Sequence, residues 1–260
     1  MVGNIICVTD ADKSAHMNGS IDTFIESKRL KLSDKKCHQI HIGKGHQNCP
    51  QLKVHENNKI KADKEKCLGD ILDKSGSIQP TVENRKSKGQ GINTGILAIL
   101  NEIPFGKHKM DVAMKLGEVM LLNGILYNSE AWHGVTKNHI KMLEAIDEDL
   151  LRKLLKSQSK KPKELLYLET GAVSIKWIIA QRRIIFLKCI LEKESNELVS
   201  KVFQAQKEKP TSGDFVKLVE QDMSALNVTY EDVKKMLKLD LKKVLKISAR
   251  NACFEDLKKY

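Results

Sequence analysis

The chain has 260 residues, a hydrophobic content of 41% and a formal net charge of +12, with an isoelectric point near 9.3. This length and apolar content allow one or two buried cores and argue against disorder throughout. The positive charge favours a polyanionic partner, either nucleic acid or an anionic membrane surface. A helical protein with an ordinary basic surface would have the same composition.

Membrane insertion and secretion are not expected. No stretch approaches the roughly 20 apolar residues that span a bilayer, and the best candidate, Trp177–Ala180, is followed by the polar run Gln181–Arg183. The first residues do not follow the pattern of a secretory signal. The six cysteines are scattered without a compact framework, which indicates reduced thiols. We therefore expect an intracellular protein, in the nucleus or the cytoplasm.

Strand signals are confined to the first 76 residues. Short β-rich runs are predicted at Ile5–Val8, Cys37–Ile42, Gln51–Val54 and Lys66–Leu72. A turn is predicted at Asp73–Gly76. Between the first two runs, apolar residues recur at helical spacing, namely Met17, Ile21, Phe24 and Ile25. These patterns predict a small sheet with a helix packed against it.

Helical patterns dominate after residue 76. Pro80 suits the first turn of a helix, Thr136 an N-cap and Gly171 a left-handed C-cap. The glycines at 89, 91 and 95 would weaken or kink the first of these helices. Apolar residues at three- and four-residue steps predict two helices, one with the stripe Val82, Ile92, Ile96, Ile99 and Leu100, the other with the stripe Ile140, Leu143, Ile146, Leu150 and Leu154. Similar patterns predict further helices over 175–191, 215–226, 230–237 and 241–257. Trp132 and Trp177 are expected to anchor the core.

The first residues resemble the second half of a polymerase active-site hairpin, with a turn at Met1–Asn4, then an apolar strand, then a helix entered at Asp12–Ser14. Further segments follow in a fixed order: Ala15–Asn18, Ile21–Phe24, Lys28–Leu32, Lys35–His38, Lys66–Asp70 and Tyr127–Trp132. In this order and spacing they resemble the C-terminal half of the reverse transcriptase of a non-LTR (LINE-type) retrotransposon. The resemblance covers most of the chain up to about residue 190.

This resemblance implies an α+β fold with a partial antiparallel palm sheet, a mostly helical thumb and a helical extension. The expected domains are residues 1–76 for the partial palm, 77–156 for the thumb and 162–260 for the extension, with a linker at 157–161. Cys67, Leu68, Gly69 and Asp70 would lie in the hairpin that grips the primer end in the family. Cys67 stands where an aromatic residue is usual.

The resemblance also implies a loss of catalysis. Nucleotidyl transfer uses two divalent metals held by carboxylates, which are Mg²⁺ ions in intact relatives. At the matching positions this chain has Gly3 and Asn4, which offer no ligand and one neutral carbonyl. We therefore expect no cofactor and an inactive polymerase fragment. The alternatives are a C-terminal piece of an active polymerase whose upstream part is missing, or a helical module that binds protein partners.

The expected residual function is sequence-independent binding to an RNA or DNA duplex. A thumb follows the duplex backbone, and basic side chains hold phosphates. Arg85, Lys86, Lys88, Lys107 and Lys109 are the candidate contacts, with further basic clusters at 160–163 and 182–183. Charge runs are also typical of ordinary solvated faces, so both interpretations stay open at this stage.

A zinc site is a further alternative. Cys37, His41, His46 and Cys49 lie close together in the sequence and are side chains that bind zinc. Their intervals are not those of a common zinc fold, and the alternation over residues 37–42 also explains the first pair as one face of a strand. No metal site is therefore predicted, and the zinc question stays open.

Overall fold

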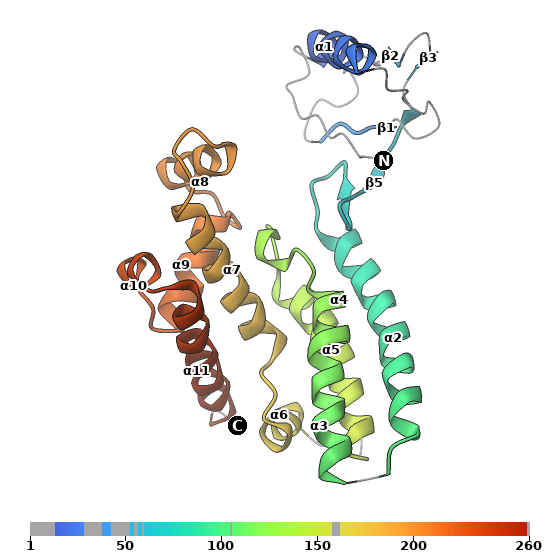
Figure 1. The fold of residues 1–260 in the computed structure, drawn as a ribbon, viewed down its shortest axis with the longest axis vertical. Helices are drawn as coiled ribbons and strands as arrows, with labels where there is room; N and C mark the ends of the chain where they lie inside the picture. Colours follow the sequence, from blue (N-terminus) through green and yellow to red (C-terminus); the bar gives the residue numbers. More distant parts are fainter. Residues whose placement is uncertain are drawn as a thin grey trace. The chain divides into compact units, whose positions relative to one another are not determined.

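The computed structural model describes residues 14–28, 38–42, 53–54, 57–58, 60–104, 106–157 and 162–258. It contains two compact units, Met1–Pro80 and Thr81–Tyr260. Helices make up most of the described residues, and the strands are short (Figure 1). The chain therefore has the expected α+β fold, in which helices predominate.

The first unit contains one helix and short paired strands. The predicted helix is present as α1 (Ser14–Ser27). Its stripe is only partly as expected, because Ile25 is buried while Phe24 is 54% exposed. The single small antiparallel sheet that was expected is not formed by the described strands, which make separate pairs. β1 (His38–Gln39) pairs with β4 (Ile60–Lys61) in parallel. The antiparallel pairs are β2 (Lys53–Val54) with β3 (Asn57–Asn58), and β5 (Lys64–Cys67) with β6 (Asp70–Asp73). The strand expected over Ile5–Val8 lies outside the described residues.

The first helices of the second unit pack around a close helix crossing. The elements are α2 (Gln79–Asn101), α3 (Lys107–Leu116), the π-helix η4 (Gly117–Leu122), α4 (Asn123–Ile125), the 3-10 helix η5 (Ser129–Ala131) and α5 (Lys137–Leu154). A Cβ atom at Gly89 would lie 2.9 Å from methyl carbons of both Ile125 and Ile146. This glycine therefore lets the α2 backbone approach its neighbours closely. The helix runs through all three glycines, and Ile99 is 46% exposed, contrary to the expected stripe.

The predicted caps are present. The Thr136 hydroxyl accepts a hydrogen bond from the His139 backbone N–H at 3.3 Å, and the His139 ring nitrogen accepts one from the Thr136 backbone N–H at 3.2 Å. This capping box satisfies two donors at the start of α5. Gly171, with a φ of 66°, ends α6 (Lys163–Thr170) in the left-handed conformation.

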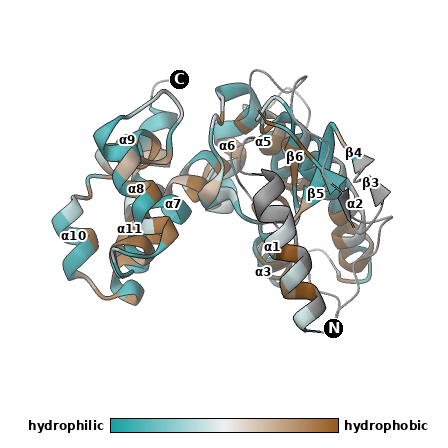
Figure 2. Cartoon of the chain, turned by 90° about the horizontal axis from the view of Figure 1, so that it is seen from above, coloured by the Kyte–Doolittle hydropathy of each residue, from teal (hydrophilic) through white to brown (hydrophobic). Residues whose placement is uncertain are grey.

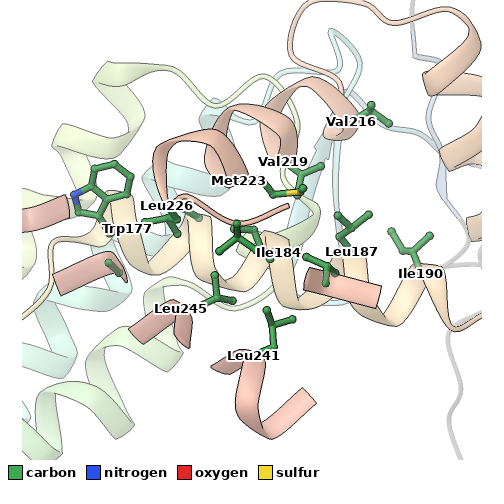
Figure 3. Packing of buried hydrophobic residues seen from close by; sticks show 14 of the residues in the cluster. Trp177, Ile184, Leu187, Ile190, Val216, Val219, Met223, Leu226, Leu241 and Leu245 are labelled. Carbon is green, nitrogen blue, oxygen red and sulfur yellow. The ribbon is translucent and has the colours of Figure 1, made fainter. Parts of the chain in front are cut away.

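The rest of the second unit surrounds α7 (Ile175–Leu191). Four helices follow it, α8 (Leu198–Glu208), α9 (Phe215–Ala225), α10 (Tyr230–Lys235) and α11 (Lys238–Leu257). Side chains from α7, α9 and α11, among them Ile184, Met223 and Leu245, meet in one apolar cluster (Figure 3). Helix α7 has apolar residues around most of its circumference, so neighbouring helices can pack against it on several sides. The other helices carry hydrophilic and hydrophobic residues side by side (Figure 2).

Both tryptophans are core residues, as predicted. Trp132 is 3% exposed and Trp177 is 6% exposed. The Trp177 indole N–H donates to the Asp256 carboxylate at 3.1 Å, which ties the start of α7 to the end of α11. The stretches expected as thumb and extension lie in the same compact unit, where α7 packs on η5 and on α5. Among the helices that the structure describes, none is long and apolar enough to cross a membrane.

Candidate nucleic-acid interface

The β5–β6 hairpin brings the four grip candidates together. Cys67 pairs with Asp70 across the strands, and Leu68 and Gly69 form the two-residue loop, with φ values of 47° and 95°. Two positive φ angles are typical of the type I′ hairpin turn, which suits Gly69 and costs free energy at Leu68. Leu68 is 64% exposed, so the hairpin presents an apolar side chain at its tip.

Cys67 in this hairpin is a neutral thiol. Partial burial raises its pKa, and the nearby carboxylates of Asp70 and Glu65 raise it further. A thiol with a raised pKa is a poor nucleophile and a poor metal ligand at neutral pH. Position 67 therefore contributes shape rather than charge to the hairpin.

Arg85 is buried within the second unit and makes its hydrogen bonds there. Its side chain is buried, its two terminal nitrogens donate to the carbonyls of Gly124 and Tyr127 at 3.4 Å each, and it lies 5.3 Å from the centre of the Tyr127 ring. The guanidinium thus fixes α2 to the end of α4. Its neighbour Lys86 is partly buried and Lys88 is exposed on the same helix.

In the basic clusters at 107–109 and 182–183, most of the lysine and arginine side chains are also used in internal contacts. Lys107 is exposed, whereas the Lys109 ammonium donates to the Ile103 carbonyl at 2.9 Å. Arg182 donates to the Asn123 side chain at 2.9 Å, and Arg183 forms an ion pair with Asp222 at 2.8 Å. Burial raises the pKa of the Asp222 carboxyl to about 6, and Arg183 offsets part of this rise. These clusters therefore offer few free cations.

A different basic surface lies on α11. Lys238, Lys242, Lys246 and Arg250 occupy every fourth position of this helix and are all exposed; together they are called the α11 basic face. Residues four apart lie on the same side of a helix, with a rise of about 6 Å between successive members. The buried side chains Leu241, Leu245 and Ala249 hold the neighbouring side of α11 against α7.

Three of the four cations of this face have no acidic partner among the described residues. Among the residues that the structure describes, no carboxylate lies within ion-pair distance of Lys242, Lys246 or Arg250. The Lys238 ammonium donates to the Cys189 thiol at 3.2 Å. Asp240, the single acidic residue between positions 238 and 250, pairs instead with Lys243 at 3.2 Å. Most of the positive charge of the α11 basic face is thus not neutralised by ion pairs among the described residues.

Most of the positions considered above for metal binding lie in parts of the chain that the structure does not describe. Gly3, Asn4, Cys37, His46 and Cys49 lie outside the described residues. His41 is described, and its ring hydrogen-bonds the Gln39 side chain at 2.8 Å. Within the described ranges, no group of three or more histidine, cysteine or acidic side chains is arranged to hold a metal ion.

Comparison of the chain with family models, with curated proteins and with solved structures finds no significant match.

Proposed function

We propose that the chain is the C-terminal part of a non-LTR retrotransposon reverse transcriptase without its catalytic carboxylates, and that it binds RNA or DNA duplexes without sequence preference. The observation that carries the binding proposal is the α11 basic face. Three of its cations have no acidic partner among the described residues, and they follow one another along a rigid helix.

Phosphate backbones suit this arrangement. The members of the α11 basic face are about 6 Å apart along the helix axis. This is on the order of two phosphate steps of one DNA strand, each about 3.4 Å along the duplex axis. Lysine and arginine contacts to phosphate carry no base information. Binding through this face is therefore sequence-independent and weakens steeply as salt is added.

Polymerase activity is not part of the proposal. Gly3 and Asn4 stand where the resemblance places the metal-binding carboxylates, and neither supplies a negative charge to Mg²⁺. We expect no extension of a labelled primer with Mg²⁺ or Mn²⁺. Metal-dependent extension above a control without protein would instead support the alternative of a piece of an active polymerase.

The binding proposal is tested with two double variants of equal charge. Lys242→Gln/Lys246→Gln removes two cations of the α11 basic face. The control, Lys153→Gln/Lys193→Gln, removes two lysines that are about half exposed and paired with Asp149 and Glu197. Duplex affinity is measured by fluorescence anisotropy over a range of salt concentrations.

The first variant should reduce the slope of log affinity against log salt by about 2, since each phosphate contact contributes about 0.9 for DNA. The control variant should change the slope by much less, because its cations are already neutralised within the chain. Equal slopes in the two variants would show that net charge, and not the α11 basic face, determines binding.

A protein-interaction module is the second candidate, and one observation favours it. Leu239 and Ile247 are 66% and 61% exposed on α11, between the basic residues. An acidic protein partner would use both the apolar and the basic side chains. Binding to such a partner should then fall on Leu239→Ala/Ile247→Ala substitution, whereas duplex binding through phosphates should not.

A further inference from the structure

A cavity of about 250 Å³ lies where the end of α6 meets α11. One side of the cavity is lined by Tyr167, Leu168, Gly171 and Ala172, and the other side by Arg250, Cys253 and Phe254 from the last turns of α11. Figure 1 shows α6 beside the C-terminal end of α11. Arg250 belongs both to this α6–α11 cavity and to the α11 basic face.

The lining of the cavity suits a flat ring with an attached anion. Phe254 and Leu168 are 46% and 47% exposed and offer apolar surface, and Tyr167 adds a buried aromatic ring. Aromatic side chains are the usual platforms for unpaired bases. Burial raises the pKa of the Cys253 thiol, so this wall is uncharged. Arg250 is the cation of the lining, and no ion pair holds it among the described residues.

The inner wall of the cavity is held by a polar cluster between α5 and α6. The buried Tyr167 ring lies near the buried Asp147 carboxyl of α5. Lys163 pairs with Glu144 at 2.9 Å and joins the same two helices. Tyr167 is only 4% exposed in total. The aromatic wall is therefore fixed before any ligand arrives, which lowers the entropic cost of binding.

We propose that the α6–α11 cavity receives one unpaired nucleotide, with its base against Phe254, Leu168 and Tyr167 and its phosphate on Arg250. Nucleic acid bound along the α11 basic face then places an unpaired base in the cavity at the Arg250 end. The volume lies just below the range of about 300–1,000 Å³ that is usual for larger ligands, so it suits a single base. In its strand-bound form, in which the nucleotide belongs to a bound nucleic-acid strand, this inference rests on the proposed function. The cavity can also be tested separately with a free nucleotide.

The test compares three DNA duplexes by fluorescence anisotropy: a blunt duplex, the same duplex with a short single-stranded overhang, and one whose overhang lacks bases. The wild-type chain should bind the normal overhang about 5- to 150-fold more tightly than the overhang without bases, as expected for one stacked base. Phe254→Ala should abolish this preference and leave the affinity for the blunt duplex unchanged.

Ile247→Ala is the matched control, because this exposed apolar residue lies on the same helix and does not line the cavity. It should retain the preference for the normal overhang. Equal affinity of the wild-type chain for the two overhangs would overturn the strand-bound form of the proposal, even if Lys242→Gln/Lys246→Gln still weakens binding to the blunt duplex.

Free adenosine and cytidine monophosphates form a separate arm, measured by calorimetry. Their binding to the wild-type chain and its loss in Phe254→Ala would support the cavity with a free nucleotide as its ligand, even if no duplex binds. Absence of both monophosphate binding and the overhang preference would overturn the inference altogether.

Discussion

The pH dependence of stability should report on the buried Asp147. Burial raises the pKa of its carboxyl to about 7, and repulsion from Glu144 and Glu148 adds to this, while its interaction with Tyr167 opposes it. In the unfolded chain an aspartate titrates near its ordinary pKa of about 3.9. Between these two values the folded state binds more protons than the unfolded state. The stability contributed by this protonation is therefore complete at low pH and is lost as the pH rises through about 7.

The magnitude follows from these two pKa values. Between pH 5.5 and pH 8, protonation of Asp147 should change the free energy of unfolding by about 2 kcal/mol. Asp147→Asn keeps the size of the side chain but removes the ionisable group, so this part of the pH dependence should disappear. At pH 8 the variant should be more stable than the wild-type chain.

Urea unfolding of both chains at the two pH values measures this effect. Asp149→Asn is the control, because Asp149 is about half exposed and pairs with Lys153 at 2.7 Å. Other groups that titrate in this range, such as Asp222, are common to all three chains and cancel in the comparison. An unchanged pH dependence in Asp147→Asn would refute the reasoning that burial keeps this carboxyl protonated.

Five further substitutions give distinct outcomes. Gly89→Ala should lower the free energy of unfolding by about 1–3 kcal/mol, because the added Cβ would crowd Ile125 and Ile146. Gly91→Ala places its Cβ in open space and should raise the free energy of unfolding by about 0.5–1 kcal/mol, and urea titration compares the two variants. Thr136→Ala should cost about 1 kcal/mol in the same assay through loss of the α5 cap, and no change would mean that the capping box is not formed in solution. Arg85→Gln should lower stability without changing the salt slope of duplex binding, and a reduced slope would instead place Arg85 on the nucleic acid. Leu68→Asn should stabilise the chain by about 1 kcal/mol, because asparagine tolerates the left-handed conformation better, and a loss of stability would contradict the strain at this turn.

Most of the helices of the second unit were predictable because their patterns are local. The apolar run over 175–191 predicts α7 with the bounds that the structure gives. Thr136 caps a helix through its hydroxyl, and Gly171 through the left-handed backbone conformation that glycine adopts easily, both as predicted. Helix α8 was not predicted. Its inward-facing residues Val199 and Phe203 lie four positions apart, so the helical spacing was present in the sequence, although Leu198 and Val202 beside them are 77% and 48% exposed.

The basic surface was harder to find from the sequence. Adjacent cations such as Arg182 and Arg183 attract attention, but their partners, Asn123 and Asp222, are distant in the sequence and come together only in the folded chain. The cations of the α11 basic face are separated by other residues. Counting lysine and arginine at every fourth position of the predicted helix over 241–257, and extending it back to Lys238, would have revealed this face.

Lysine footprinting with an amine-reactive reagent, with and without bound duplex, tests the central claim most directly. The degree of modification at each lysine is read by mass spectrometry. We predict that bound duplex protects Lys242 and Lys246 from modification. Lys153 and Lys193 are also exposed, and they should react equally with and without duplex. Protection confined to other lysines, with Lys242 and Lys246 modified equally with and without duplex, would contradict the α11 basic face as the nucleic-acid interface.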